Sequence, residues 1–432
     1  MPQPSPTNPT AAPAPLRVGL IGFGCVGQGF YDIVQRLPAA GIVISRIVVK
    51  SPTKPRPLPA ERFEFDADAL LTDPALDVLI EVIDDADEAF RLVSAALHRG
   101  RRVVTANKAL LARHLPELRE LEQQYGGTLL YEAAVAGSIP ILRTLDGYFG
   151  LEPLRAVSGI INGSSNYVLS RMSEDSGDYA TALAEAQAQG FAETDPTLDM
   201  AAFDPRSKAV LLAAHAFGLE INPEEILNLG IENISPRDLA YADVRGLKIK
   251  VVAHLERLPD NRVAAMVLPR FVGPASPLFA VEHETNGVLV EAAYGGPQFL
   301  RGKGAGGHPT GSAVLADVAA LRAGYRYSYA KGTGTAPALA TDLELEVYLR
   351  HDDEQLPKQL GMRELSAENR TPGRRFSVGY VRLEVLRDQR DALRAAGVFV
   401  ATTGLSRVGK QVGEHHSTQS FAEQAEFREV RR

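Results

Sequence analysis

The amino-acid sequence predicts an α/β protein with two main domains and a small C-terminal α/β segment. A short apolar strand, Leu16 to Leu20, runs into a glycine-rich turn that opens a helix, as at the start of an open parallel sheet. From Leu247 three successive runs alternate apolar and polar residues, which predicts an antiparallel or mixed sheet with one face covered. A chain of 432 residues can hold both domains.

Composition argues against several classes of protein. The net charge is −7 and no basic stripe is present, so nucleic-acid binding is not expected. No apolar run approaches the roughly 20 residues of a membrane span. The one cysteine, Cys25, excludes a disulfide framework and fits a reducing cytoplasm. Residues 1–15 are Pro-rich without a secretory pattern, so we expect a disordered lead.

The glycine-rich turn reads Gly22-x-Gly24-x-x-Gly27. Glycines allow a tight turn and let backbone N–H groups approach a pyrophosphate at the helix N-terminus. Because a strand precedes the turn and a helix follows it, a Rossmann-type nucleotide-binding domain is favoured over a plain glycine turn. The candidate cofactor-binding residues of the turn are Gly22, Phe23, Gly24, Cys25, Val26 and Gly27.

Positive charge follows the second predicted strand, Ile42 to Val49. The strand ends in Lys50, and Lys54 and Arg56 come soon after. NAD-binding folds usually carry an acid near this place for the ribose hydroxyls, whereas cations suit a 2′-phosphate. We therefore predict NADP rather than NAD, bound by Lys50 and Arg56. Solvated loop cations are the alternative, above all for Lys54.

Two further segments carry candidate residues. A short apolar strand ends in Thr105-Ala106-Asn107-Lys108, and open α/β sheets place ligands at such strand ends. Lys108 could otherwise be an ordinary helix-start lysine. Glu132 precedes small residues that would let backbone carbonyls converge. A carboxylate with carbonyls is a hard oxygen cage that suits an alkali ion rather than zinc, and a buried Glu that caps a turn is the alternative.

The segment Gly190 to Lys208 gathers carboxylates and ends in a lysine before an apolar run. Asp204 and Pro205 predict a helix start, with Asp204 at the N-cap and Pro205 at the first helical position. Lys208 then lies in the first turn, where the helix dipole disfavours a cation. Dipole and partial burial should lower the pKa of Lys208, which suits proton transfer near neutral pH. For any single residue a solvated acidic loop is the alternative, but the ordered set favours a site.

This set resembles the signature of homoserine dehydrogenase. The pattern consists of Ala186, Gly190, Asp195-Pro196, Asp199, Asp204 and Lys208. One position departs, because Ala202 stands where the family usually has Gly. The segments at 105–108, 162–166 and 302–310 resemble further family motifs, with Ser for Thr in the second. The resemblance covers roughly residues 16–324.

The resemblance implies the NAD(P)-dependent interconversion of L-homoserine and L-aspartate 4-semialdehyde, a step toward threonine and methionine. In this reaction Lys208 would be the general acid/base, Asp204 would position it, and Lys108 would polarise the reacting oxygen. Glu193 would hold the substrate ammonium. The remaining implied site residues are the substrate-binding Asp199 and Lys108 and the cofactor-binding Thr105, Lys108, Gly304 and Gly306.

The resemblance also implies a monovalent cation, Na⁺. Its ligands would be the carboxylate of Glu132 and the backbone carbonyls of Val135, Gly137 and Ile139. The family often has Gly-Gly where this chain has Asp84-Asp85. Two carboxylates would repel a cofactor phosphate, so we expect both to be turned away from it.

The expected domains follow from the same comparison. Residues 16–150 form the NAD(P)-binding domain, completed by 308–325, and residues 151–307 form a catalytic and dimerisation domain of a homodimer or homotetramer. Residues 338–404 form a C-terminal module and 405–432 a disordered tail. Many family members end in a regulatory domain that binds an amino acid. The turn usual after its first strand is missing here, so we expect a reduced module without end-product feedback.

Two competing functions remain at this point. Another two-domain dehydrogenase, such as aspartate-semialdehyde dehydrogenase, forms a thioester and needs a nucleophilic Cys beside a His. The only thiol, Cys25, lies inside the glycine turn, which disfavours that chemistry. A non-enzymatic NADP sensor would not need Glu193, Asp204 and Lys208 together.

Overall fold

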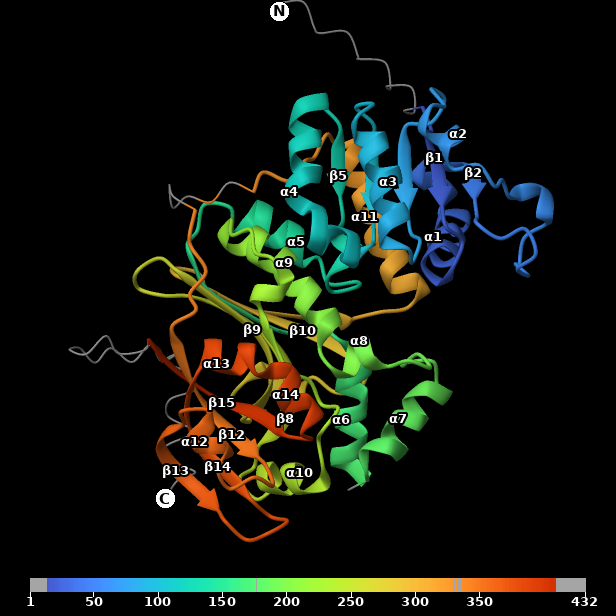
Figure 1. Cartoon of the computed structure of the whole chain (residues 1–432). Helices are drawn as coiled ribbons and strands as arrows, with labels where there is room; N and C mark the ends of the chain where they lie inside the picture. The colour runs from blue at the N-terminus through green and yellow to red at the C-terminus, as the bar shows by residue number, and fades with distance from the viewer. Residues whose placement is uncertain (1–13, 176, 330, 332–335, 409–432) are drawn as a thin grey trace, which may run out of the picture.

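The computed structural model describes residues 14–175, 177–329, 331 and 336–408. Figure 1 shows one sheet with its helices at the top and a second, larger sheet below it, with the C-terminal strands at its lower end. This mixed architecture confirms the predicted fold class. Residues 1–13 of the expected lead and 409–432 of the expected tail lie outside the described residues.

The first sheet has five parallel strands in the order β2-β1-β3-β4-β5. The order reverses between β1 and β3, and open α/β sheets bind ligands at the carboxyl ends of the strands at such a point. The strands are β1 Leu16–Ile21, β2 Ile42–Val48, β3 Val78–Glu81, β4 Arg102–Thr105 and β5 Thr128–Leu130. The helices are α1 Cys25–Arg36, α2 Asp68–Leu71, α3 Ala86–Leu97, α4 Lys108–Tyr125 and, from later in the chain, α11 Gly307–Arg322.

Helix α11 packs against α1 at very short range because both helices carry glycine at the contact. A Cβ atom on Gly29 would lie 2.1 Å from the carbonyl carbon of Gly307, so a larger side chain would push the helices apart. Since α1 begins directly after the glycine-rich turn, α11 supports that turn from outside the sheet (Figure 1).

The second sheet is mixed and has the order β11-β10-β6-β8-β9-β15-β12-β14-β13, with β7 paired to β9. Strand β9 is buried at every position, so the expectation of one covered face is wrong for this strand. Its alternate residues enter two different cores, because α9 packs on one face and the C-terminal module on the other.

The bounds of these elements follow. The strands are β6 Leu154–Ile160, β7 Leu227–Asn228, β8 Lys248–Arg257, β9 Val263–Val272, β10 Thr285–Ala292 and β11 Gly296–Lys303. The helices are α5 Ile141–Arg143, α6 Gly163–Asp175, α7 Tyr179–Ala188, α8 Thr197–Met200, α9 Phe203–Phe217 and α10 Pro236–Asp243.

The C-terminal module has a split β-α-β arrangement, with its strands in the order β15-β12-β14-β13. Its first helix, α12, has only four residues, and the reduced module stays a prediction. The predicted tail is wrong for residues 405–408, because β15 runs to Val408 and pairs there with Leu343 of β12. The elements are β12 Leu343–Arg350, α12 Leu356–Gln359, β13 Arg363–Asn369, β14 Phe376–Arg382, α13 Leu383–Asp388, α14 Arg390–Ala395 and β15 Phe399–Val408.

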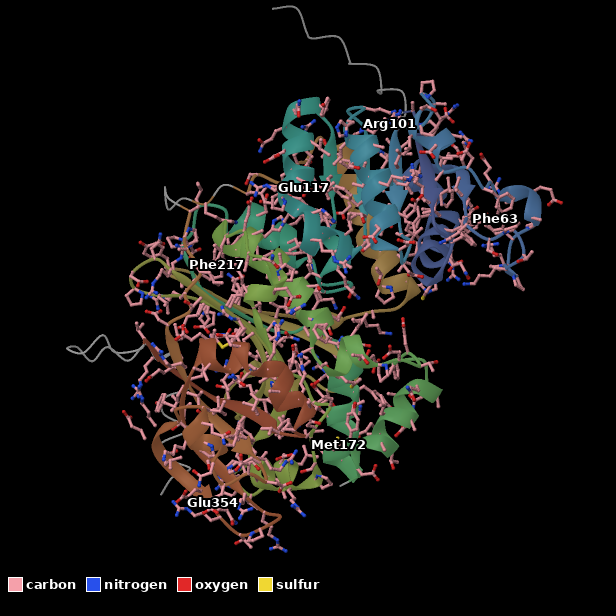
Figure 2. The ribbon with its side chains drawn as sticks, viewed as in Figure 1. Phe63, Arg101, Glu117, Met172, Phe217 and Glu354 are labelled. Carbon is pink, nitrogen blue, oxygen red and sulfur yellow. The ribbon has the colours of Figure 1, made fainter. Side chains whose placement is uncertain are left out.

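A buried polar cluster ties the first sheet to helix α9. The hydroxyl of Tyr131, just after β5, lies 2.8 Å from His215 Nε2 and 2.6 Å from the Tyr329 hydroxyl. Phe217 at the end of α9 and Met172 in α6 are fully buried (Figure 2). The two domains are therefore joined by packed side chains as well as by the chain.

None of the described helices is long and apolar enough to cross a membrane.

Candidate active site

Helix α9 begins two residues earlier than the sequence predicts. Its N-cap is Ala202 and not Asp204, and Lys208 consequently lies in the second turn instead of the first. The reason is the backbone of Ala202, which is left-handed with φ of +61° and starts the helix early. Such a conformation costs a non-glycine residue roughly 1 kcal/mol, which explains why glycine is the expected residue here. Asp204 caps no N–H group, so its carboxylate can reach other partners.

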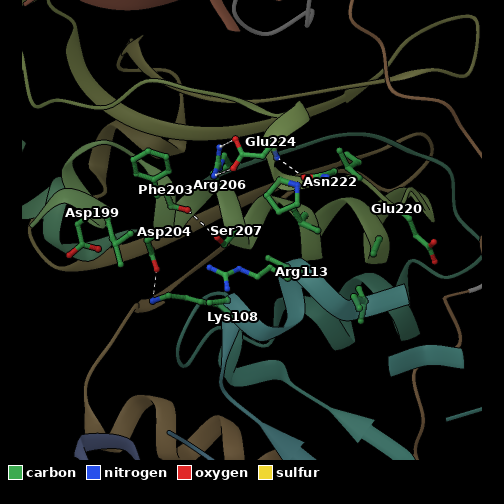
Figure 3. Close-up of a pocket in the computed structure, with 18 of the residues that line it drawn as sticks. Lys108, Arg113, Asp199, Phe203, Asp204, Arg206, Ser207, Glu220, Asn222 and Glu224 are labelled. Atoms are coloured by element: carbon green, nitrogen blue, oxygen red, sulfur yellow. Dashed lines mark hydrogen bonds and ion pairs between the residues drawn. The ribbon is translucent and has the colours of Figure 1, made fainter. Parts of the chain in front are cut away.

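That carboxylate is shared by two lysines from different domains. Lys108 Nζ, from the start of α4, lies 2.5 Å from Asp204 Oδ1. Lys208 Nζ lies 2.7 Å from Asp204 Oδ2 and donates a second hydrogen bond of 2.7 Å to the carbonyl of Ile161. Figure 3 shows Lys108 facing Asp204 across the junction between α4 and α9. The predicted catalytic residues are thus brought together.

The environment separates the two lysines electrostatically. Attraction to Asp204 raises the pKa of Lys108, whose side chain is 44% exposed. Burial lowers the pKa of Lys208, which is 9% exposed, and outweighs the pull of Asp204. Burial alone would raise the pKa of Asp204, but the charges of Lys208 and Lys108 hold it below the ordinary range. Lys108 is therefore the fixed cation and Lys208 the amine that loses a proton more readily.

Asn162 fixes the carboxylates from the other side. Its Nδ2 donates to Asp199 Oδ1 at 2.7 Å and to Asp204 Oδ2 at 2.9 Å. Its Oδ1 accepts from the backbone N–H of Ser165 at 2.8 Å, and this bond determines which way the amide faces. The sequence analysis noted the motif at 162–166 but gave Asn162 no role. The signal was available, since a buried Asn before a helix usually caps it.

A cleft of about 930 Å³ opens beside the cluster, between α4 and α9 (Figure 3). All three predicted substrate residues line it: Lys108, the exposed Glu193 and the partly buried Asp199. Asp195 lines it as well, but its carboxylate binds Thr197. Glu185, an acid in the helix before this segment, bonds to Tyr167 and Arg171 instead.

The glycine turn lies at the carboxyl end of β1. Gly22 has φ of +104°, and a Cβ there would lie 2.6 Å from the carbonyl oxygen of Val82. A Cβ on Gly27 would lie 2.4 Å from the Gly22 oxygen, so both positions require glycine. The Phe23 ring is buried against Tyr31 and Phe63, which leaves only its backbone for a cofactor.

The other residues of the turn differ in environment. Gly24 is the N-cap of α1, with open space where a Cβ would be. Cys25 is exposed and Val26 is partly buried in the first turn of α1. Backbone N–H groups at this helix start are therefore accessible to an anion.

Lys50 and Arg56 lie beyond β2. The Lys50 side chain is 93% exposed, and its ammonium is 3.8 Å from Asp85. Arg56 covers the Phe63 ring at 5.2 Å. The Asp85 carboxylate accepts from the backbone N–H of Glu88 and caps α3. Asp85 is thus committed to its own helix and to Lys50.

Thr105 is fully buried, and its hydroxyl is not free for a ligand. The hydroxyl donates to Glu81 Oε2 and accepts from the backbone N–H of Asn107 at 3.0 Å. Glu81 also accepts from the N–H of Ile83 at 2.7 Å. Burial raises the pKa of Glu81 to about 7. The sequence analysis missed this residue, although an acid at the end of an apolar strand is itself a signal.

A second glycine-rich turn, residues 302–307, packs between the two domains. A Cβ on Gly304 would lie 2.2 Å from Asn286 Cγ, and a Cβ on Gly137 would lie 2.4 Å from the Gly304 oxygen. Gly304 is therefore required by packing whether or not it also approaches a cofactor. Gly306, with φ of +112°, is the N-cap of α11.

Two family models match the chain. The one described as "Homoserine dehydrogenase, NAD binding domain" matches residues 22–132, and the one described as "Homoserine dehydrogenase" matches residues 140–319. The curated homoserine dehydrogenase of Mycobacterium tuberculosis is 37% identical over 315 residues, which are 70% of this chain and 71% of that protein.

The chain belongs to the homoserine dehydrogenase family. The homoserine dehydrogenase of Bacillus subtilis is 33% identical over 71% of this chain and 72% of its own length. The crystal structure of a homoserine dehydrogenase from Thiobacillus denitrificans matches with a TM-score of 0.75 at 27% identity, covering 90% of this chain and 98% of its own. The predicted resemblance is confirmed.

Membership also confirms the predicted class of enzyme. A homoserine dehydrogenase is an NAD(P)-dependent oxidoreductase that acts on a CH–OH group, and the match over residues 22–132 supports a nicotinamide cofactor. The two alternatives, another two-domain dehydrogenase and a non-enzymatic sensor, are thereby set aside.

The segment that is predicted to hold a cation is anchored through Glu132. Its carboxylate accepts from the backbone N–H groups of Leu142 at 2.7 Å and Arg143 at 2.9 Å, as in the alternative reading of a buried Glu that caps a turn. Asp317, fully buried nearby, accepts from the Glu132 N–H, and its Oδ1 forms no hydrogen bond. The Arg143 guanidinium faces both carboxylates.

At that segment two carboxyl groups, those of Glu132 and Asp317, are buried beside one guanidinium. Burial raises the pKa of Glu132 and of Asp317, and Arg143 is the cation that faces both. Within the described residues no group of three or more His, Cys, Asp or Glu side chains is placed to hold a metal ion. A cation here would therefore depend on backbone carbonyls, as predicted for Val135, Gly137 and Ile139. The donor set, oxygen alone, fits an alkali ion.

Replacing Glu81 by Gln should change how stability depends on pH. The folded pKa of Glu81 is about 7, whereas the unfolded value is about 4.3. Between these values the folded state keeps a proton that the unfolded state has lost, so wild-type stability falls as pH rises. We expect the melting temperature of Glu81→Gln to improve relative to wild type between pH 5 and pH 7. The exposed Glu117→Gln is the control, and a difference independent of pH would contradict the assignment.

Proposed function

We propose that this chain interconverts L-homoserine and L-aspartate 4-semialdehyde at the cluster of Lys108, Asp204 and Lys208. The observation that carries these roles is one buried carboxylate that holds two ammonium groups with pKa values pushed in opposite directions. Such a separation is typical of sites in which one group keeps its charge and the other exchanges a proton.

The roles follow from this difference. A nicotinamide cofactor, when bound, would supply hydride transfer to or from the substrate carbon that carries the oxygen. During oxidation the neutral amine of Lys208 accepts the hydroxyl proton, and during reduction its ammonium returns that proton to the carbonyl oxygen. The charge of Lys108 stabilises negative charge on the same oxygen. Asp204 holds the Nζ atoms of Lys108 and Lys208 in position through its two ion pairs.

The amino-acid part of the substrate is assigned to the acidic wall of the cleft. Glu193 is exposed on that wall and has the charge to bind the substrate ammonium. Asp199 lies one hydrogen bond from Asn162 and two from Asp204. Asp199 would therefore bind the substrate close to the reacting oxygen. Lys108 lies where it can contact both the reacting oxygen and the amino-acid part of the substrate.

NADP is the proposed cofactor. The cofactor would be held by the backbone of residues 22–27, by the turn before Lys108 and by Gly304 and Gly306. Lys50 and Arg56 would bind its 2′-phosphate. The exposed ammonium of Lys50, only 3.8 Å from the Asp85 carboxylate, supports this choice because it is free to move to a stronger anion.

Three further properties are proposed. A monovalent cation, Na⁺, binds the Glu132 carboxylate and the carbonyls of Val135, Gly137 and Ile139, where it would oppose the burial that raises the pKa of Glu132. The enzyme works in the cytoplasm, consistent with its single cysteine. It assembles as a homodimer or homotetramer through the second domain.

Lys208→Ala should abolish turnover while leaving cofactor binding almost unchanged. The amine is the proposed proton carrier, and loss of such a group typically costs about 10²–10⁴-fold in rate. Homoserine oxidation and NADPH fluorescence titration measure the two properties. Lys358→Ala, in α12 of the C-terminal module, is the control. Unchanged turnover in Lys208→Ala would refute its role.

Lys50→Glu should weaken NADP more than NAD. A carboxylate at this position repels a 2′-phosphate but can accept hydrogen bonds from ribose hydroxyls. The ratio of kcat/KM for the two cofactors in homoserine oxidation measures the preference, with Lys54→Glu as the matched control. Equal losses for both cofactors would mean that Lys50 does not contact the phosphate.

Sodium should stabilise the wild-type protein specifically. We expect a higher melting temperature in NaCl than in choline chloride of equal ionic strength, because a bound ion stabilises the folded state by mass action. Glu132→Gln should remove this difference, and the exposed Glu117→Gln should preserve it. Identical melting in both salts would rule out the proposed cation.

A further inference from the structure

The C-terminal module reaches the turn that precedes the catalytic helix. Arg394 of α14 donates through Nη2 to the carbonyl oxygens of Ala201 at 3.0 Å and Asn228 at 2.8 Å. Its guanidinium lies 4.8 Å from the ring centre of Phe203, the first residue of α9. An arginine of the C-terminal module is therefore bound to the backbone three residues before Asp204.

Arg394 binds the turn at Ala201 and Ala202, and the backbone conformation of this turn needs support from its neighbours. Ala202 is left-handed with φ of +61°, and a non-glycine residue keeps such a conformation only where its surroundings impose it. The Met200 oxygen accepts from the Ile231 N–H at 2.8 Å, and the Ala201 oxygen accepts a second bond of 2.9 Å from Asn228 Nδ2. Arg394 completes this set of donors and is the only one of the three that comes from the C-terminal module.

Helix α14 is itself fixed on the second domain. Arg394 Nε donates to Glu232 at 3.1 Å, and Asn233 Nδ2 donates to the Arg394 carbonyl at 3.0 Å. One turn earlier, Arg390 pairs with Glu224 at 2.5 Å. Figure 1 shows α14 at the side of the module that faces the substrate domain. The guanidinium of Arg394 is thus a rigid support.

The position of this turn determines where Asp204 meets its lysines. Asp204 is three residues beyond Ala201, and its two oxygens lie 2.5 Å and 2.7 Å from Lys108 and Lys208. Misplacement of a catalytic group by about 1 Å can cost up to 10²-fold in rate. Relaxation of Ala202 toward ordinary helical or extended backbone would move Asp204 and break both pairs.

We propose that Arg394 is a positioning residue for catalysis: it holds the left-handed turn at Ala202, and through that turn it places the carboxylate of Asp204 between Lys108 and Lys208. This inference rests on the proposed roles of Asp204 and Lys208. It gives the C-terminal module a direct part in the reaction of the same chain, independent of any small molecule bound to the module.

The test compares Arg394→Met with Arg387→Met, a substitution of the same kind in the neighbouring helix α13, where the arginine pairs with the adjacent Asp388. We expect Arg394→Met to lower kcat for homoserine oxidation by about tenfold, with the dissociation constant for NADPH within about twofold of wild type. Arg387→Met should keep the wild-type kcat. Arg394→Lys, which keeps the charge but loses the planar pair of donors, replaces Arg394→Met if the latter does not fold.

Repeating the comparison in an Ala202→Gly variant distinguishes a role of Arg394 in holding the turn from a role in packing alone. Ala202→Gly removes the backbone strain, since glycine adopts the left-handed conformation freely. In this background the loss caused by Arg394→Met should shrink to about threefold or less, because the turn no longer needs the arginine as strongly. An equal loss in both backgrounds would overturn the proposal, as would a wild-type kcat in Arg394→Met.

Hydrogen exchange gives a readout that does not depend on activity. In Arg394→Met the amides of residues 200–206 should exchange faster, while those of α6 and α11 should not change. If wild type shows no homoserine oxidation but this change is seen, the proposed reaction fails and the positioning of the turn stands. If exchange at 200–206 is unchanged, Arg394 does not hold the turn and the inference fails.

Discussion

The shared carboxylate of Asp204 is the constraint on which the rest of this structure depends. A carboxylate that is 5% exposed is strongly disfavoured unless cations compensate it, and here the cations come from α4 of one domain and α9 of the other. The ion pairs therefore require a fixed arrangement of the two domains. In this cluster the attraction of Asp204 raises the pKa of Lys108, whereas burial outweighs that attraction and lowers the pKa of Lys208.

Several distant segments serve this one contact. Asn162 orients the carboxylates of Asp199 and Asp204 without adding charge, so the balance between the lysines is left intact. Tyr131 and His215 join β5 to the far end of α9. The C-terminal module binds the turn in front of the helix through Arg394. Helix α9 is thus held near its beginning by Asn162 and Arg394 and near its end by Tyr131.

The sequence predicted the elements well where local physics decides them. Strand β1, the glycine turn and α1 follow from an apolar run and from Gly22 and Gly27, where a Cβ would clash with the backbone. The predictions from sequence failed where contacts with residues distant in the chain decide the local structure. The N-cap of α9 is Ala202 because the surrounding donors impose a left-handed residue there, and local preference had favoured Asp204. Residues 405–408 look like a polar tail but complete a strand against β12.

The sequence by itself determined the family and the fold class and named the candidate reactive groups, because these depend on residue type and spacing. Lys108, Glu193, Asp204 and Lys208 could all be named from the chain. Only the tertiary structure decided that Lys108 and Lys208 share one carboxylate, that Asn162 and Glu81 hold the site, and that Arg394 reaches it from the C-terminal module. The physical reason is that charge, burial and hydrogen bonding act between residues close in space, and sequence separation carries no information about that distance.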